Sequence, residues 1–106
     1  MLYQVVFSPE ALAQLEALYG YVAQAASPDI ASRHTNAIVT YCEGLHTFPR
    51  RGSRRDNIRP GLRISNYKKR AVIAFAVDAD VVAIVGVYYG GQDYESALRW
   101  DEDAVE

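Results

Sequence analysis

Two helix-start signals, at Ser8 and Ser27, constrain the fold of this chain more than any other feature. Ser8-Pro9-Glu10 and Ser27-Pro28-Asp29 each place a serine before a proline and an acid. A serine N-cap, a proline at the first helical position and an acid in the first turn all favour a helix that begins there. The short interval between the two signals predicts two helices that pair as an antiparallel hairpin.

Apolar residues at helical spacing follow both signals. The first stripe predicts a helix to about Ala26 and consists of Leu12, Leu15, Tyr19 and Val22. The second stripe consists of Ile30, His34, Ile38, Tyr41 or Cys42, Leu45 and Phe48. Pro49 cannot continue a helix, so the second helix is expected to end there. Each helix therefore has one apolar face that must be covered.

Four segments rich in Val, Ile, Tyr and Phe predict β-strands, at residues 2–7, 62–67, 68–77 and 81–89. Pro60-Gly61 and Asp78-Ala79-Asp80 are turn signals before the second and fourth of them. The element order predicts an α+β fold, in which an N-terminal strand and an antiparallel helical hairpin pack on a small, mainly antiparallel sheet. We expect one domain over residues 1–100, followed by an acidic tail at residues 101–106.

Both faces of the predicted sheet are apolar. In the third strand, Ala71, Ile73, Phe75 and Val77 are expected beneath the helices, with Val72 and Ala74 on the other side. In the fourth strand, strict alternation sets Val81, Ala83, Val85 and Val87 against Val82, Ile84, Gly86 and Tyr88. A sheet covered by helices on one side should be polar on the other, so the second face is expected to bind a partner.

Composition narrows the cellular setting. Cys42 is the only cysteine, which excludes an intrachain disulfide and a cysteine-based zinc site and favours a reducing, cytoplasmic location. The N-terminus has no basic signal region, and no apolar run approaches the roughly 18 residues that a membrane span needs. We expect no membrane association, and no metal or cofactor.

Positive charge is concentrated in the middle of the chain. Nine of the 11 Lys and Arg residues lie between Arg50 and Arg70, with Asp56 as the only acid among them. That segment has a net charge of +8, whereas the whole chain has −2. Residues 50–61, called the basic loop below, connect the second helix to the second strand. The charge suits an acidic partner, although the loop can also be read as a solvated connection.

The order of these elements and four short motifs resemble the ParE branch of the RelE/ParE superfamily of bacterial toxins. The motifs are FPRRG at residues 48–52, PGLR at 60–63, YKKRAVIAF at 67–75 and VYYGGQD at 87–93. Gly52 and Pro60-Gly61 fit the family's turn before the second strand, and Arg63 matches its arginine. Tyr67 and Arg70 fit the opening of the next strand. The last strand departs from the family, because Gly86, Tyr89 and Gln92 stand where arginine, histidine and arginine are common.

The resemblance implies the toxin of a type II toxin–antitoxin module of ParDE type, with a role in plasmid stabilization. Such a toxin inhibits DNA gyrase by protein–protein binding and is neutralised by a ParD-like antitoxin, as a homodimer or a hetero-oligomer with it. The target-binding residues expected are Arg59, Arg63, Lys68, Lys69, Arg70, Tyr88 and Tyr89. The antitoxin-binding residues expected are Leu12, Tyr19, Val72, Ala74, Val82 and Ile84.

Two other functions remain open from the sequence. A ribosome-dependent messenger RNA endonuclease of RelE type would need a base and an acid near its cations, yet His34 and His46 read as structural residues of the second helix. A relative that only forms complexes is the other. Cys42 shares the helix stripe and reads as a buried residue, not a nucleophile. Sequence-specific DNA binding is not expected, since no helix is basic along one face.

Overall fold

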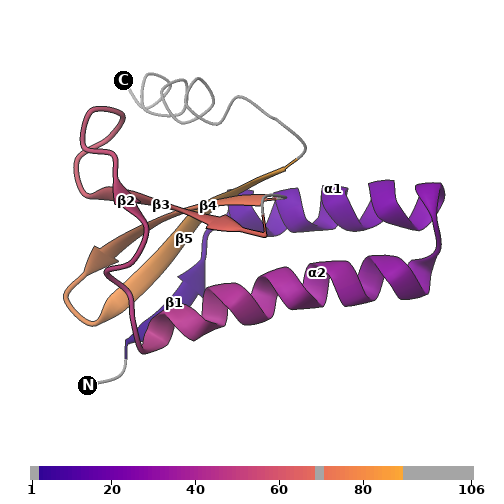
Figure 1. The fold of residues 1–106 in the computed structure, drawn as a ribbon, viewed down its shortest axis with the longest axis horizontal. Coiled ribbons are helices and arrows are strands. Elements are labelled where there is room, and N and C mark those ends of the chain that lie inside the picture. Colours follow the sequence, from indigo (N-terminus) through magenta and orange to yellow (C-terminus); the bar gives the residue numbers. More distant parts are fainter. Residues whose placement is uncertain (1–2, 69–70, 90–106) are drawn as a thin grey trace.

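The protein is a five-stranded sheet with two helices on one face (Figure 1). The computed structural model describes residues 3–68 and 71–89 of the 106-residue chain. Its elements are β1 (Gln4–Phe7), α1 (Pro9–Ala25), α2 (Pro28–Glu43), the 3₁₀ turn η1 (Gly44–His46), β2 (Ser53–Arg54), β3 (Leu62–Tyr67), β4 (Ala71–Asp78) and β5 (Val81–Tyr89). The strands lie in the order β1-β5-β4-β3-β2. Only β1 and β5 pair in parallel, so the predicted mainly antiparallel α+β fold is confirmed.

Both predicted serine caps begin their helices. The Ser8 hydroxyl accepts a hydrogen bond from the Ala11 amide at 3.0 Å, and the Ser27 hydroxyl accepts one from the Ile30 amide at 3.2 Å. The two helices lie side by side and project past the sheet (Figure 1). The end of α2 differs from the prediction. The α-helix stops at Glu43 and continues only as η1, so Phe48 leaves the apolar stripe and is 71% exposed.

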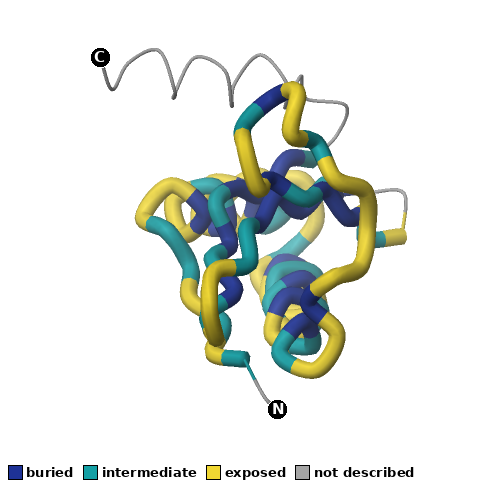
Figure 2. Tube along the Cα trace, turned by 90° about the vertical axis from the view of Figure 1, so that its left-hand side faces the viewer, coloured by how far each residue is buried: buried dark blue, intermediate teal, exposed yellow. Residues whose placement is uncertain are grey.

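The main core lies between the helices and the sheet. Its buried residues are Ala11, Leu15, Leu18, Ile38, Cys42, Leu45, Ala71, Ile73, Phe75, Val82, Ile84 and Val87. Figure 2 shows the buried positions gathered in the interior, with the exposed segments around them. The face predicted for β4 is confirmed, since Ala71, Ile73 and Phe75 are buried in this core and Val77 packs against it.

The predicted alternation along β5 is wrong. Ala74 pairs with Gly86 and Phe75 with Ile84, so Val85 is an extra residue in β5. Such a bulge reverses the face of every later side chain. Val82 and Ile84 therefore share the main core with Val87, whereas Tyr88 packs on the opposite side of the sheet.

Part of the second sheet face is covered by the chain itself. Ile58, in the basic loop, packs there against Leu62, Ile64, Ala74 and Tyr88, and all five residues are buried. Val72 and Val85 are partly buried against this second cluster. The loop therefore supplies cover that the sequence led us to expect from a partner.

Candidate interaction surface

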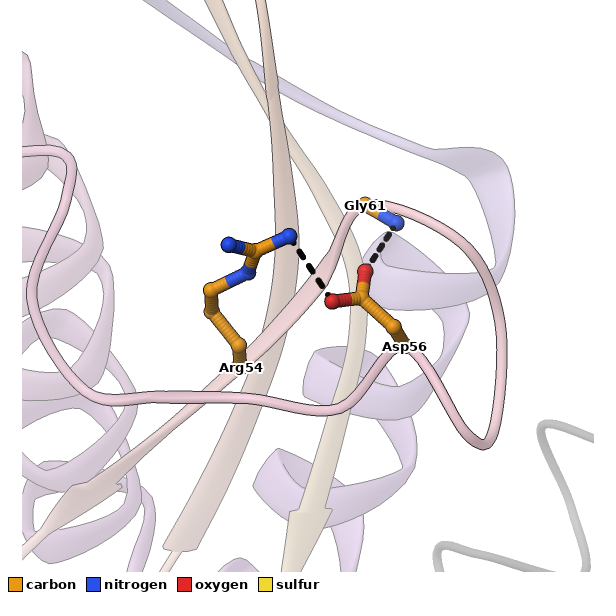
Figure 3. A network of polar contacts seen from close by, with 3 residues as sticks. All are labelled: Arg54, Asp56 and Gly61. Carbon is orange, nitrogen blue, oxygen red and sulfur yellow. Dashed lines mark hydrogen bonds and ion pairs between the residues drawn. The ribbon is translucent and has the colours of Figure 1, made fainter.

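The basic loop has a defined shape, held by a turn around its only acid. The Asp56 carboxylate accepts a hydrogen bond from the Gly61 amide at 2.9 Å and forms a 2.8 Å ion pair with Arg54 (Figure 3). The pKa of Asp56 lies below its ordinary value, chiefly because of the Gly61 hydrogen bond and also because of the positive charge of Arg54. The carboxylate thus closes the turn.

The start of the loop lies very close to β3. Gly52 has φ +77°, and a Cβ there would lie 2.2 Å from the carbonyl oxygen of Ile64. Only glycine fits both the conformation and the space. This approach lets β2 pair with β3, where Ser53 lies opposite Ile64 and Arg54 opposite Arg63. This pairing holds the cations of the loop beside β3, at the edge of the sheet formed by β2.

Aromatic and cationic side chains meet where α2 faces β3. Leu62 and Ile64 belong to the second cluster, so Arg63, Ser65 and Tyr67 point to the helix side of the sheet. There the Tyr41 hydroxyl, from α2, hydrogen-bonds the Ser65 hydroxyl. The rings of Tyr41 and Tyr67 have centroids 5.2 Å apart.

A cation lies over each of these two rings. The guanidinium carbon of Arg51 is 5.5 Å from the centroid of the Tyr41 ring, and the ammonium of Lys68 is 5.5 Å from that of Tyr67. Both distances lie within the range of cation–π attraction. Arg63 approaches Arg51 from β3, since its guanidinium donates to the Arg51 carbonyl oxygen at 3.5 Å. Four residues from α2, the loop, β3 and the following turn therefore form one row: Arg51, Tyr41, Tyr67 and Lys68.

The expected target-binding residues are distributed over different parts of the protein. Arg63 and Lys68 lie on the helix side of β3, and Arg59 is half-buried in the basic loop. Tyr88 is only 4% exposed, within the second cluster. Tyr89 lies on the opposite side, where its ring meets that of His34 edge-on at 5.8 Å. Lys69 and Arg70 fall outside the described residues. Arg63 and Lys68 are the expected target residues that remain together on an accessible surface.

The expected antitoxin-binding residues also separate into accessible and buried ones. Leu12 and Tyr19 are exposed on α1, at 53% and 38% of their surface, and Val72 is half-buried. Ala74, Val82 and Ile84 are fully buried. Burial of Val82 and Ile84 follows from their place beneath the helices, and burial of Ala74 follows from the cover that Ile58 provides. A partner can therefore reach only the first three without a rearrangement.

A groove that sequence reasoning missed runs between α1 and the end of β5. β1 ends at Phe7, whereas β5 continues to Tyr89, so α1 borders the last part of β5. The groove has a volume of about 270 Å³ and is lined by Gln14, Ala17, Leu18, Tyr21, Val87 and Tyr89. The Gln14 side chain accepts a hydrogen bond from the Val87 amide at 2.6 Å. The helical spacing of Gln14, Leu18 and Tyr21 is visible in the sequence, but their meeting with β5 is not.

Cys42 in α2 and His46 in η1 have structural surroundings. Cys42 is fully buried, and burial raises the pKa of its thiol to about 12, which keeps the sulfur protonated and unreactive. In η1, the His46 ring nitrogen Nδ1 lies 2.7 Å from the Glu43 carbonyl oxygen. Among residues 3–68 and 71–89, no group of three or more His, Cys, Asp or Glu side chains could hold a metal ion. Over the same residues, no helix is long and apolar enough to cross a membrane.

Comparison with known proteins places the chain in a family. The family described as the ParE toxin of the type II toxin–antitoxin system parDE matches residues 5–94. Among solved structures, the chromosomal ParDE toxin–antitoxin system from P. aeruginosa matches with a TM-score of 0.73 and 20% identity, over 83% of this chain and 96% of that one. The toxin–antitoxin complex RelBE2 from Mycobacterium tuberculosis matches with a TM-score of 0.60 and 20% identity, over 85% and 100% respectively. No curated protein matches the chain.

Proposed function

Because this chain belongs to the ParE toxin family of type II toxin–antitoxin systems, we propose that it inhibits DNA gyrase by protein–protein binding and is neutralised by a ParD-like antitoxin. The observation that carries the gyrase proposal, beyond the family, is the accessible cationic surface on the helix side of β3. Arg63 and Lys68, both expected from the sequence to bind the target, are the residues proposed to contact gyrase. Such cations suit carboxylates on the surface of a protein partner.

The antitoxin is proposed to bind on α1. Leu12 and Tyr19 are large, exposed apolar residues that share one flank of this helix, whereas the groove lined by Gln14, Ala17 and Tyr21 opens on the opposite flank. Antitoxin segments that fold on binding use long apolar anchors. We infer that the antitoxin covers the flank of α1 that carries Leu12 and Tyr19, and that it can do so without displacing the core residues Val82 and Ile84.

A gyrase assay tests the proposal. Purified protein is incubated with DNA gyrase, supercoiled plasmid and ATP, and the DNA is examined for linear product after denaturation. We expect linear DNA, and we expect an equimolar amount of the co-encoded antitoxin to abolish it. The variant Arg63→Ala/Lys68→Ala should give at least about tenfold less product, since removal of each charged partner at an interface costs about 1–2 kcal/mol.

The matched control is Arg33→Ala, which removes an exposed cation from α2, far along the chain from the proposed surface. It should leave the amount of linear product unchanged. Thermal unfolding of each variant verifies that the fold is intact. A folded protein that gives no linear product contradicts gyrase poisoning. A toeprint on translated messenger RNA would then test the RelE-type nuclease, and harmless expression without antitoxin would identify a relative that only forms complexes.

A further inference from the structure

The row of Arg51, Tyr41, Tyr67 and Lys68 continues into an open hollow. This hollow has a volume of about 450 Å³ and is lined by Tyr3, Thr47, Phe48, Pro49, Arg50 and Arg51. Arg51 belongs to both, because it lines the hollow and also lies over the Tyr41 ring. We call the combined set the aromatic–cationic surface; it consists of Tyr41, Phe48, Arg50, Arg51, Tyr67 and Lys68. Arg51 therefore joins a set of three rings and three cations.

Phe48 is the residue of this surface that the fold does not explain. It is 71% exposed, the largest exposed fraction among the large apolar residues of the described chain. It follows η1 and lies outside both apolar clusters, so it makes no contribution to either core. An exposed ring beside cations is a common device for stacking against a flat, negatively charged partner.

The segment that supplies most of this surface contains a single acid, and Glu43, exposed on α2, lines a neighbouring hollow that shares Tyr3. Asp56 is the only Asp or Glu between Gly44 and Val77, and its carboxylate is held by Arg54 and Gly61. Arg50, Arg51 and Lys68 are exposed. The surface therefore complements a chain of negative charges.

The combination of rings and cations indicates which kind of polyanion the surface would bind. An acidic peptide pairs its carboxylates with the cations, but it offers a flat face to each exposed ring only where its own side chains are aromatic. Duplex DNA hides its bases and is read by an element that enters a groove, and this surface has none. A single strand presents both a phosphate backbone and free base faces, and proteins hold it with a positively charged groove lined by stacking aromatic side chains.

We propose that the aromatic–cationic surface binds single-stranded nucleic acid, through stacking on Phe48 and the tyrosines and through phosphate contacts with Arg50, Arg51 and Lys68. This binding is independent of base sequence, because the rings and cations offer no pattern of donors and acceptors that would select a base. It shares Lys68 with the proposed gyrase-binding surface, and it is measured with no gyrase present.

Fluorescence anisotropy of a labelled oligothymidylate of about 12 nucleotides tests the proposal with the full chain free of antitoxin. We expect saturable binding at about 50 mM salt that weakens as salt rises. Phe48→Ala should weaken binding about tenfold, because it removes a stacking platform. Tyr21→Ala is its matched control, since Tyr21 is an aromatic residue of α1 that is 66% exposed and lies outside the surface. The control should bind like the unaltered protein.

The contribution of the cations is measured by the salt dependence of the affinity. Arg51→Ala should reduce the slope of log affinity against log salt by about 0.7, the value of one phosphate contact on a single strand. Arg33→Ala should leave the slope unchanged. All four substituted residues are exposed or half-buried, and thermal unfolding verifies each fold. Absence of saturable binding overturns the proposal. An affinity that Phe48→Ala leaves intact, with equal binding of a polyglutamate peptide, also overturns it and identifies a surface for acidic protein.

Discussion

Two glycines with nearly equal φ angles show how differently the basic loop constrains its residues. Gly52 has φ +77° and Gly61 has φ +79°, so both lie in the left-handed region. A Cβ at Gly52 would collide with the backbone of Ile64, whereas a Cβ at Gly61 would meet no atom within 4 Å. The first glycine is required by space and conformation, and the second by conformation alone.

Gly52→Ala and Gly61→Ala should therefore differ in cost. We expect Gly61→Ala to reduce the free energy of unfolding by about 1 kcal/mol, from the left-handed conformation alone. Gly52→Ala should cost about 3 kcal/mol or more, because the loop must also move away from β3. Guanidinium unfolding of both variants measures the difference. Equal losses would show that the close approach of Gly52 to Ile64 does not occur in solution.

Asp56 makes the loop sensitive to acid. Its pKa is lowered from the ordinary value of 3.8 by the Gly61 hydrogen bond and the Arg54 charge. A carboxyl whose pKa is lower in the folded state stabilises the fold above its unfolded pKa, and the stabilisation is lost as pH falls through the folded pKa. The contribution should be fully present near pH 7 and disappear below pH 3.8.

The comparison of the protein with Asp56→Asn isolates this contribution. Asparagine keeps an oxygen that can accept from the Gly61 amide but carries no charge to titrate. The substituted protein should be the less stable near pH 7, and the gap between the two should narrow below pH 3.8. Urea midpoints across that range measure the gap. A gap that is the same at both ends would show that the charge of Asp56 has no part in stability.

At the scale of elements, helix α1 protects an edge of the sheet. β5 extends beyond the end of β1, so within the described chain its final residues have no neighbouring strand on the β1 side. The Ser8 hydroxyl donates to the Val85 carbonyl oxygen at 3.2 Å, and the Gln14 side chain accepts from the Val87 amide at 2.6 Å. Exposed strand edges invite pairing with other chains. The N-cap serine of α1 and one side chain within the helix thus substitute for missing strand partners.

Gln14→Ala tests this protection. It removes the acceptor of the part-buried Val87 amide, and an unsatisfied buried amide costs about 1–3 kcal/mol. We expect a loss of that size in chemical unfolding. Gln14→Glu is the matched control, because its carboxylate can still accept the hydrogen bond, and it should lose much less. Similar losses in both would place the role of Gln14 in packing and not in the hydrogen bond.

Most helices and strands could be predicted from local signals, but the side of the sheet on which the end of β5 packs could not. Serine caps, prolines and turn residues act on their immediate neighbours, so the two helices and four of the five strands could be predicted from the sequence, whereas β2 and the order of the strands in the sheet could not. The bulge at Val85 is a tertiary event, in which Tyr88 lies so close to Gly86 that a Cβ there would be 2.6 Å from its ring. The alternation of side chains along the strand could not reveal this bulge. The departure of Gly86 from the family's arginine was visible, and the structure supplies its packing reason.

At the scale of the whole molecule, the charged segment was predictable and its surface was not. The cluster of Lys and Arg is a property of the sequence, and so is the acidity of the remaining chain. Which cations lie beside which rings depends on the contact between α2 and β3, which joins Tyr41 to Ser65 and Tyr67. The sequence offers Tyr41 only as an alternative to Cys42 on the apolar stripe of the second helix. Its half-exposed ring proved to lie between Arg51 and Tyr67.

The pairing of β1 with β5 also sets when the protein can assemble during its synthesis. β5 lies between β1 and β4 and supplies Val82, Ile84 and Val87 to the main core. Until that strand leaves the ribosome, β1 has no partner and the helical hairpin lacks much of the surface on which it packs. Contacts this distant along the chain form late. The fold of a nascent chain therefore cannot close until β5, the last strand of the described chain, has been synthesised.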